Sequence, residues 1–167
     1  MPEPWLRGER LDTDPAIEQI LFSIQQVRED LFAIVVEDIW RAIPGIPTLG
    51  FQLTHIAGSL DRLTTYLEGR ELDPIQLAFL DGERTPGASR SELMERVELA
   101  LSRTVDTLRL LNPAAFSEPR YVGRKKIPTT VIGLAIHIAE HTQRHCGQAI
   151  TTSKLLTTSG SPLQPPA

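Results

Sequence analysis

Three of the four histidines in this chain of 167 residues lie within nine residues, in the stretch HIAEHTQRH. His137, His141 and His145 are spaced four apart, which on a helix places them on one face with adjacent Cβ atoms about 5–6 Å apart. Two imidazoles at this spacing can bind one metal ion. His137 and His145, however, are separated by about 12 Å along a helix axis. Geometry therefore allows one adjacent pair, His137/His141 or His141/His145, and leaves the choice open.

The remaining histidine, His55, lies in the separate stretch QLTHIAGSLDRL. Catalytic zinc sites commonly have three protein ligands and an open fourth position. If the fold places the two stretches side by side, His55 completes such a set. The sequence offers no obvious fourth ligand, and we interpret the lone Cys146 as a small buried apolar residue. An open metal site is therefore expected.

A rival interpretation uses the same residues. HIAEH matches the inverted zinc-protease pattern H-x-x-E-H, in which Glu140 is the general base and His137 and His141 are ligands. Proteases of that class have a further carboxylate ligand downstream, and no Asp or Glu follows Glu140 here. The three-histidine site is therefore preferred, with His137 and Glu140 beside it as outer-sphere or acid–base catalytic residues.

The elements that position these residues are predicted to be helices. Apolar residues recur at steps of three and four through most of the chain, and no segment has a convincing strand pattern. Asp14 is a suitable N-cap, followed by Pro15 at the first helical position, and Ser89 with Glu92 has the form of a capping box. Four long helices are expected, over Asp14 to about Ile43, Thr48 to Gly69, Ser89–Ser91 to Asn112-Pro113, and Pro128 to about Leu156.

The connections complete the predicted organisation. DPIQLAFL within residues 70–88 predicts a short helix. A loop of about fifteen residues after Pro113 contains Tyr121 and the basic run GRKK, which is interpreted as a solvated face, with a gate over a site as the alternative. Residues 1–13 are expected to form an extended N-terminal arm. Residues 14–157 are expected to form the bundle, and residues 158–167 a flexible C-terminal tail.

Composition excludes several classes of function. A net charge of −4 and an isoelectric point near 5.6 give no electrostatic basis for binding nucleic acid or an anionic membrane. No run of apolar residues is long enough to span a bilayer, and the first residues do not have the pattern of a signal peptide. A single cysteine excludes a disulfide within the chain, and a cytoplasmic protein is expected.

The pairing of LTHIAGSLDRL with HIAEHTQRHCGQAI resembles the DinB/YfiT-like superfamily. This resemblance implies an all-α four-helix bundle, usually described as up-up-down-down, that often forms a homodimer. It also implies a divalent metal ion, most often zinc or nickel. The ligands would be one histidine from the second helix and an H-x-x-x-H pair just before Gly-Gln. Here those residues are His55, His141 and His145, followed by Gly147 and Gln148.

The resemblance also implies an activity class. Some members are metal-dependent S-transferases that use a low-molecular-weight thiol such as bacillithiol, mycothiol or glutathione, and others are thiol-dependent isomerases. We therefore expect a metal-dependent thiol S-transferase, or a related hydrolase or isomerase, with a small-molecule substrate. Cys146 stands where relatives often carry arginine, so any role of that arginine is not expected here. The alternative is a non-catalytic bundle that binds a metal or small molecule and acts through dimerisation.

Overall fold

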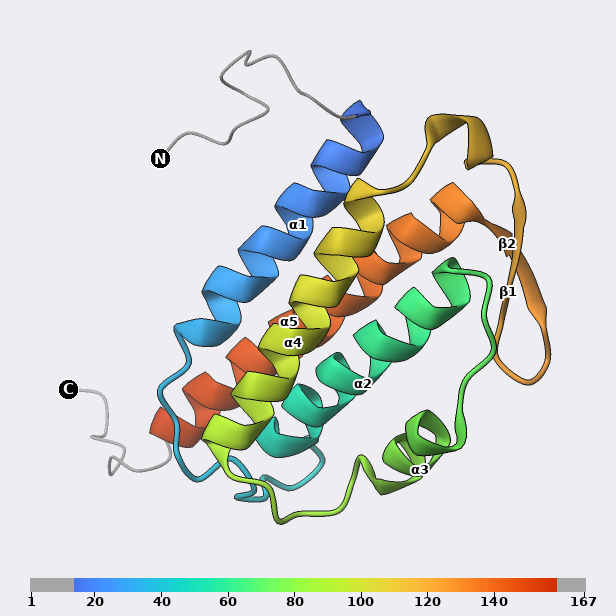
Figure 1. Ribbon diagram of the computed structural model, residues 1–167. Helices are drawn as coiled ribbons and strands as arrows, with labels where there is room; N and C mark the ends of the chain where they lie inside the picture. Colours follow the sequence, from blue (N-terminus) through green and yellow to red (C-terminus); the bar gives the residue numbers. More distant parts are fainter. Residues whose placement is uncertain (1–13, 159–167) are drawn as a thin grey trace.

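Four long helices pack side by side around one apolar core in the computed structural model, which describes residues 14–158 (Figure 1). They are α1 (Pro15–Phe32), α2 (Leu49–Leu67), α4 (Arg90–Arg109) and α5 (Val131–Thr158). A short helix, α3 (Pro74–Gly82), lies on the connection between α2 and α4. The predicted arm over residues 1–13 and the predicted tail beyond Thr158 lie outside the described residues.

Three of the four predicted starts of the long helices are confirmed, and the fourth was wrong, because Pro128 lies in a strand and α5 begins at Val131. The Asp14 side chain accepts a hydrogen bond from the backbone N–H of Ala16, and Thr48 accepts one from Phe51. Ser89 and Glu92 form both hydrogen bonds of a capping box. These side chains satisfy backbone donors that a helix N-terminus leaves without intrahelical partners. The first turn of each of these helices is therefore specified locally.

The predicted end of the first helix was wrong. α1 ends at Phe32 rather than near Ile43. The β-branched run Ile34-Val35-Val36 follows at once, and such residues lose side-chain freedom in a helix. Ile34 and Ile39 remain buried although the segment is not helical. The apolar periodicity continued past the helix because the following loop also contributes residues to the core.

The helix directions differ from the expected up-up-down-down order. α2 and α4 run parallel, since Thr64 lies 2.9 Å from Thr104 and Thr107 donates to Glu68, hydroxyl to side-chain oxygen. α1 and α5 both run opposite to them, so the order is up-down-down-up (Figure 1). Parallel neighbours need a connection that returns along the bundle, and residues 68–89, with α3, provide it. Residues 33–48 and 110–130 each reverse the chain between antiparallel helices.

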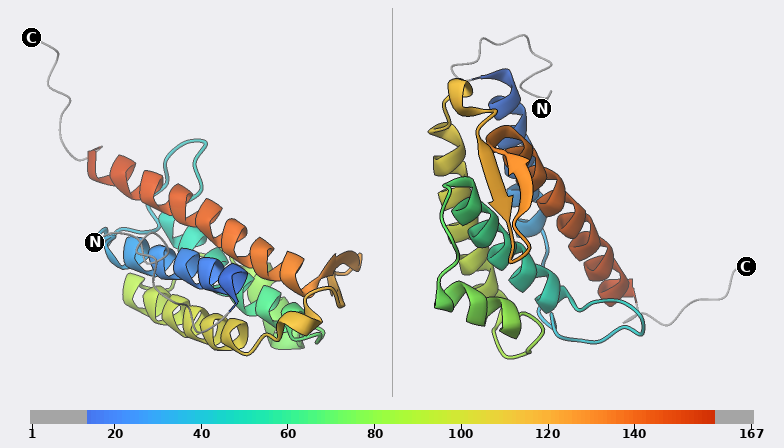
Figure 2. Two further views of the ribbon diagram at one scale, coloured as in Figure 1. Left: turned by 90° about the horizontal axis from the view of Figure 1, so that it is seen from above. Right: turned by 90° about the vertical axis from the view of Figure 1, so that its right-hand side faces the viewer.

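A β-hairpin occupies much of the loop in which no strand was predicted. Strand β1 (Pro119–Val122) pairs antiparallel with β2 (Ile127–Thr130), and the short 3₁₀ helix η2 (Pro113–Ala115) precedes them. The two strands have four residues each, too few to show a period-two pattern in sequence. The hairpin contacts α2 and α5 (Figure 2).

The basic run GRKK forms the turn of this hairpin and is exposed, as a solvated face should be. Gly123 and Lys126 adopt positive φ angles there, of 72° and 47°. Arg120 of β1 donates from Nε to the carbonyl oxygen of Leu67, at the end of α2, over 2.8 Å. Leu67 is about 18 Å along α2 from His55. This hydrogen bond places Arg120 near the end of α2 that is farther from His55. In the turn itself, Nζ of Lys126 lies 3.8 Å from Oε1 of Glu71.

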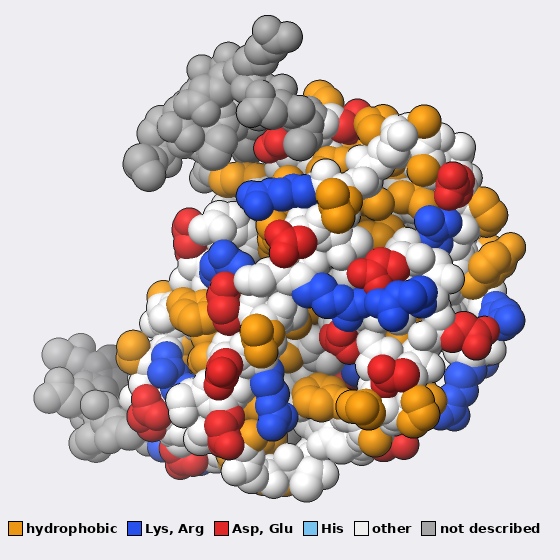
Figure 3. All heavy atoms as spheres, in the orientation of Figure 1, with side chains coloured by type: hydrophobic (Ala, Val, Ile, Leu, Met, Phe, Trp, Pro, Cys, Tyr) orange, Lys and Arg blue, Asp and Glu red, His pale blue; other side chains and the backbone are white. Residues whose placement is uncertain are grey.

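Acidic and basic side chains are interspersed on the face in Figure 3 rather than gathered by sign. No helix among residues 14–158 is long and apolar enough to cross a membrane.

The loop after α1 is fixed to α2 by one close approach. Trp40 donates from its indole N–H to the carbonyl oxygen of Ala88 over 2.8 Å, and its ring lies over Gly50. A Cβ at Gly50 would come within 2.6 Å of the ring, whereas a Cβ at Gly147 in α5 would meet nothing within 4 Å. The two glycines therefore form a matched pair, one crowded and one open.

We expect Gly50→Ala to lower the free energy of unfolding by about 1–3 kcal/mol, because it overpacks a rigid aromatic contact. Gly147→Ala should leave that free energy unchanged or raise it by up to about 1 kcal/mol through helix propensity. Urea unfolding followed by circular dichroism measures both. Equal changes in the free energy of unfolding for the two substitutions would show that the Trp40 ring does not pack closely against Gly50.

Candidate metal centre

Three half-buried histidines converge between α2 and α5. One ring nitrogen from each of His55, His141 and His145 can be chosen so that all three lie within 4.8 Å of one another. The Nε2 atoms of His55 and His141 are 3.2 Å apart. Two nitrogen ligands of a tetrahedral zinc ion, with bonds of about 2.0–2.1 Å, lie about 3.3 Å apart. The three imidazoles therefore fit a single divalent ion.

Antiparallel packing of α2 on α5 produces this convergence. His141 and His145 are one turn apart on α5, and their ring centroids are 4.7 Å apart. His55, from α2, lies between them, with centroid distances of 5.3 Å to His141 and 4.3 Å to His145. The structure thus groups the pair His141/His145 with His55, which is the arrangement that the family resemblance implied.

His145 is oriented by a buried amide. Its Nδ1 lies 2.9 Å from Oε1 of Gln52, which is fully buried, and Gln52 in turn donates from Nε2 to Gln148 over 3.0 Å. Because an amide oxygen only accepts, Nδ1 of His145 carries the proton and Nε2 keeps its lone pair. Metal-binding histidines usually donate their other N–H in this way.

His55 has a carboxylate partner. Its Nδ1 lies 2.7 Å from Oε2 of Glu83, the residue that follows α3. On its other side, the ring stacks against Phe51 at a centroid distance of 5.6 Å. The Arg84 guanidinium lies 4.5 Å from the centre of the Phe51 ring, where a cation–π contact is favourable. The His55 ring is therefore contacted by Glu83 at Nδ1 and by Phe51 on one ring face.

His137 and Glu140 lie beside this cluster but outside it. His137 has a ring centroid 5.5 Å from that of His141, and its Nδ1 is 2.9 Å from Oε1 of Glu140. Both side chains are exposed, at 41% and 57%. The hydrogen bond from His137 lowers the pKa of the Glu140 carboxyl. A general base works best with a pKa near the operating pH, so this geometry does not favour the protease interpretation. The predicted catalytic role of the two residues stays a prediction.

Cys146 takes no part in the cluster. It is buried, and its burial raises the pKa of the thiol to about 12. A thiol of this kind is neutral and neither a good nucleophile nor a metal ligand at neutral pH. This agrees with its interpretation as a small apolar residue.

Sequence reasoning missed Gln52 and Glu83. Gln52 precedes His55 by three residues, a spacing that places both on one face of α2 and could have marked it. Nothing in the sequence around Glu83 marks it, because its position depends on how α3 packs against α2.

Comparison with known proteins agrees with this arrangement. The sequence profile of the DinB superfamily matches residues 35–149, which include all four histidines. The chain belongs to the DinB superfamily. Within this DinB protein, the matched segment runs from the loop after α1 through most of α5. No curated protein matches the chain in sequence.

The electrostatics of the cluster favour the neutral forms of His141 and His145. Burial, followed by the neighbouring His145 and His55, lowers the pKa of His141 to about 4, from an ordinary value of 6.5. Burial also lowers the pKa of His145. Neutral imidazoles are the form that binds metal ions, since the protonated ring has no free lone pair.

The metal-free protein should therefore lose stability as the pH falls from about 6.5 to about 4. In this window the unfolded state binds a proton at His141 that the folded state does not, which lowers the free energy of unfolding. His141→Gln removes the group and should lose less stability over the same range. Urea unfolding at several pH values with a chelator present checks this, and identical losses in both proteins would contradict it.

Proposed function

We propose that this DinB protein is a divalent-metal-dependent enzyme whose ion is held by His55, His141 and His145. The observation that supports this most directly is the convergence of three ring nitrogens within 4.8 Å, from two helices that are distant in sequence. Zinc or nickel is the proposed ion, since both accept imidazole ligands. With three protein ligands and no fourth in the cluster among the described residues, a coordination position is left for substrate.

Thiol S-transfer is the proposed reaction, with a related hydrolysis or isomerisation as variants. A divalent ion with an open position would supply Lewis-acid chemistry, favouring the thiolate form of a thiol or lowering the pKa of water. The chain itself favours the neutral forms of His141 and His145, because burial lowers the pKa of both, and it orients His145 through Gln52. His137 and Glu140, beside His141 and open to solvent, are placed where they could exchange a proton with a substrate. The substrate is proposed to be a small molecule that reacts with a low-molecular-weight thiol.

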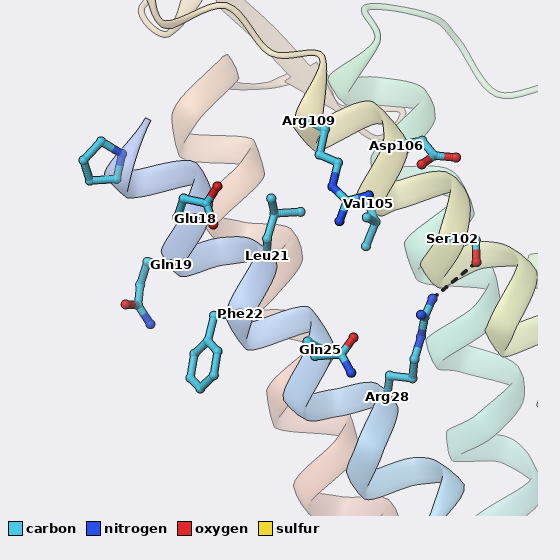
Figure 4. A pocket seen from close by; sticks show the side chains of 11 residues that line it. Glu18, Gln19, Leu21, Phe22, Gln25, Arg28, Ser102, Val105, Asp106 and Arg109 are labelled. Atoms are coloured by element: carbon cyan, nitrogen blue, oxygen red, sulfur yellow. Dashed lines mark hydrogen bonds between the residues drawn. The ribbon is translucent and has the colours of Figure 1, made fainter. Parts of the chain in front are cut away.

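The alternative is a non-catalytic bundle that binds a small molecule and acts as a homodimer. It is favoured by a cavity of about 540 Å³ between α1 and α4, which none of the histidines lines. Figure 4 shows the polar and apolar side chains of the two helices that surround it, among them Phe22, Gln25 and Arg109. A ligand bound there would be remote from the metal centre.

Elemental analysis of protein purified without a histidine tag tests the ligand set. We expect about one equivalent of zinc or nickel in the wild type and its loss in His55→Ala and in His141→Ala, because two imidazoles hold an ion much more weakly than three. His137→Ala is the matched control and should retain the ion, since its ring is outside the cluster. Loss of metal in His137→Ala together with retention in His55→Ala would restore the protease interpretation.

Calorimetry with thiols distinguishes the enzyme from the alternative. Glutathione, bacillithiol or mycothiol should bind the metal-loaded wild type and should not bind metal-free His141→Ala, because the open coordination position is the binding site. If none of the three thiols binds, or if binding does not depend on the metal, thiol transfer is wrong and the non-catalytic alternative is favoured.

A further inference from the structure

Glu83 uses both carboxylate oxygens at the edge of the metal centre. Oε2 lies 2.7 Å from Nδ1 of His55, and Oε1 lies 2.7 Å from Nη1 of Arg62. Glu83 is 4% exposed and Arg62 is 8% exposed. A buried charge is tolerated only when it is paired, so each of the two side chains depends on the other. The result is a buried chain of contacts from Arg62 through Glu83 to His55.

A glycine on α2 makes room for this chain. A Cβ at Gly58 would lie 2.6 Å from Oε1 of Glu83, 2.7 Å from Nη1 of Arg62 and 2.7 Å from Phe79 of α3. Real Cβ atoms do not approach other atoms this closely, so any larger residue would displace the Arg62–Glu83 pair. At Gly82, the last residue of α3, a Cβ would meet nothing within 4 Å. The requirement for glycine is therefore specific to the place where α3 packs on α2.

The chemistry of the three groups fixes the proton on His55. A carboxylate only accepts hydrogen bonds, so Nδ1 of His55 must be the donor to Glu83. In the neutral ring Nε2 then keeps its lone pair, and this is the atom that faces His141 across 3.2 Å. Arg62 pairs with the second carboxylate oxygen through an ion pair rather than a hydrogen bond, and the charge attraction opposes rotation of the carboxylate away from this position.

We propose that Glu83 is a positioning residue, delivered by α3 over Gly58 and held by Arg62, that keeps His55 in the tautomer able to bind a metal through Nε2. The proposal rests on the proposed metal site for its functional meaning. The tautomer itself is a property of the metal-free chain and can be measured without any ion.

Glu83→Gln is the informative variant because it keeps the shape and removes one acceptor. The positive charge of Arg62 attracts the amide oxygen and repels the amide NH₂, so the oxygen turns toward Arg62 and the NH₂ turns toward His55. Nδ1 of His55 then has to accept, and its proton moves to Nε2. The isosteric substitution is therefore expected to invert the tautomer and block the metal-binding nitrogen.

Two measurements on the full chain test this. Long-range ¹H–¹⁵N NMR of the metal-free protein should show His55 protonated at Nδ1 in the wild type and at Nε2 in Glu83→Gln. Competition with a chromophoric chelator should show zinc affinity lowered about 10–100-fold in Glu83→Gln, the usual effect of removing an outer-sphere partner of a ligand. Glu140→Gln makes the same chemical change beside His137, outside the cluster, and should leave both readings as in the wild type.

The outcomes separate this proposal from the metal site itself. An unchanged His55 tautomer in Glu83→Gln, with wild-type zinc affinity, overturns the role of Glu83 while leaving the metal site standing. The expected tautomer inversion in a chain that binds no zinc supports the positioning geometry and overturns the proposed function instead.

A second pair of variants guards against a folding defect. Gly58→Ala should lower zinc affinity by a similar factor, and Gly82→Ala should not, with circular dichroism showing that both remain helical. Equal zinc affinity in Gly58→Ala and Gly82→Ala would contradict the delivery of Glu83 over Gly58.

Discussion

The antiparallel contact between α2 and α5 is the interaction on which the centre depends. It places Gln52 opposite Gln148 and His55 opposite His141 and His145. A shift of one helical turn would move these partners about 5.4 Å apart. Gln52 has no exposed surface, and a buried amide without hydrogen bonds is costly. The bonds of Gln52 to His145 and Gln148 therefore help to fix the register that brings the histidines together.

The polar centre works against the stability of the bundle that contains it. Three imidazoles are held close together and partly out of water, where protonation of one disfavours protonation of the next. Apolar residues at these positions would pack without that penalty. A ligand that binds only the folded state offsets the penalty by mass action. Close, neutral imidazoles are thus easier to understand as part of a binding site than as part of the core.

Local signals in the sequence predicted local structure well. N-caps, the capping box and the three-and-four periodicity predicted where helices begin and which faces are buried, because these depend on neighbouring residues. The end of α1 was missed because Ile34 and Ile39 are buried in a loop and so continue the apolar pattern. The hairpin was missed because four-residue strands carry too little pattern. Helix direction depends on where the long connection lies, which periodicity does not report.

In the candidate centre, too, the sequence predicted some residues and could not predict one that depends on packing. The spacing of His141 and His145 on one helix could be read directly, and the usual number of zinc ligands suggested His55. The family resemblance then selected this pair over His137/His141. Glu83 could not be found, because it reaches His55 only through the packing of α3 on Gly58.

The connection between α2 and α4, which makes the helix order differ from the predicted one, also contributes a residue to the site. Parallel α2 and α4 require the chain to return along the bundle between them, and the return segment needs an anchor on α2. α3 packs there over Gly58, where the backbone is not covered by a side chain. Glu83 follows α3 immediately as its C-cap, and this same residue contacts His55. In this fold the connection over residues 68–89 is therefore part of the metal centre. A change in how it packs on α2 would first alter the position of His55.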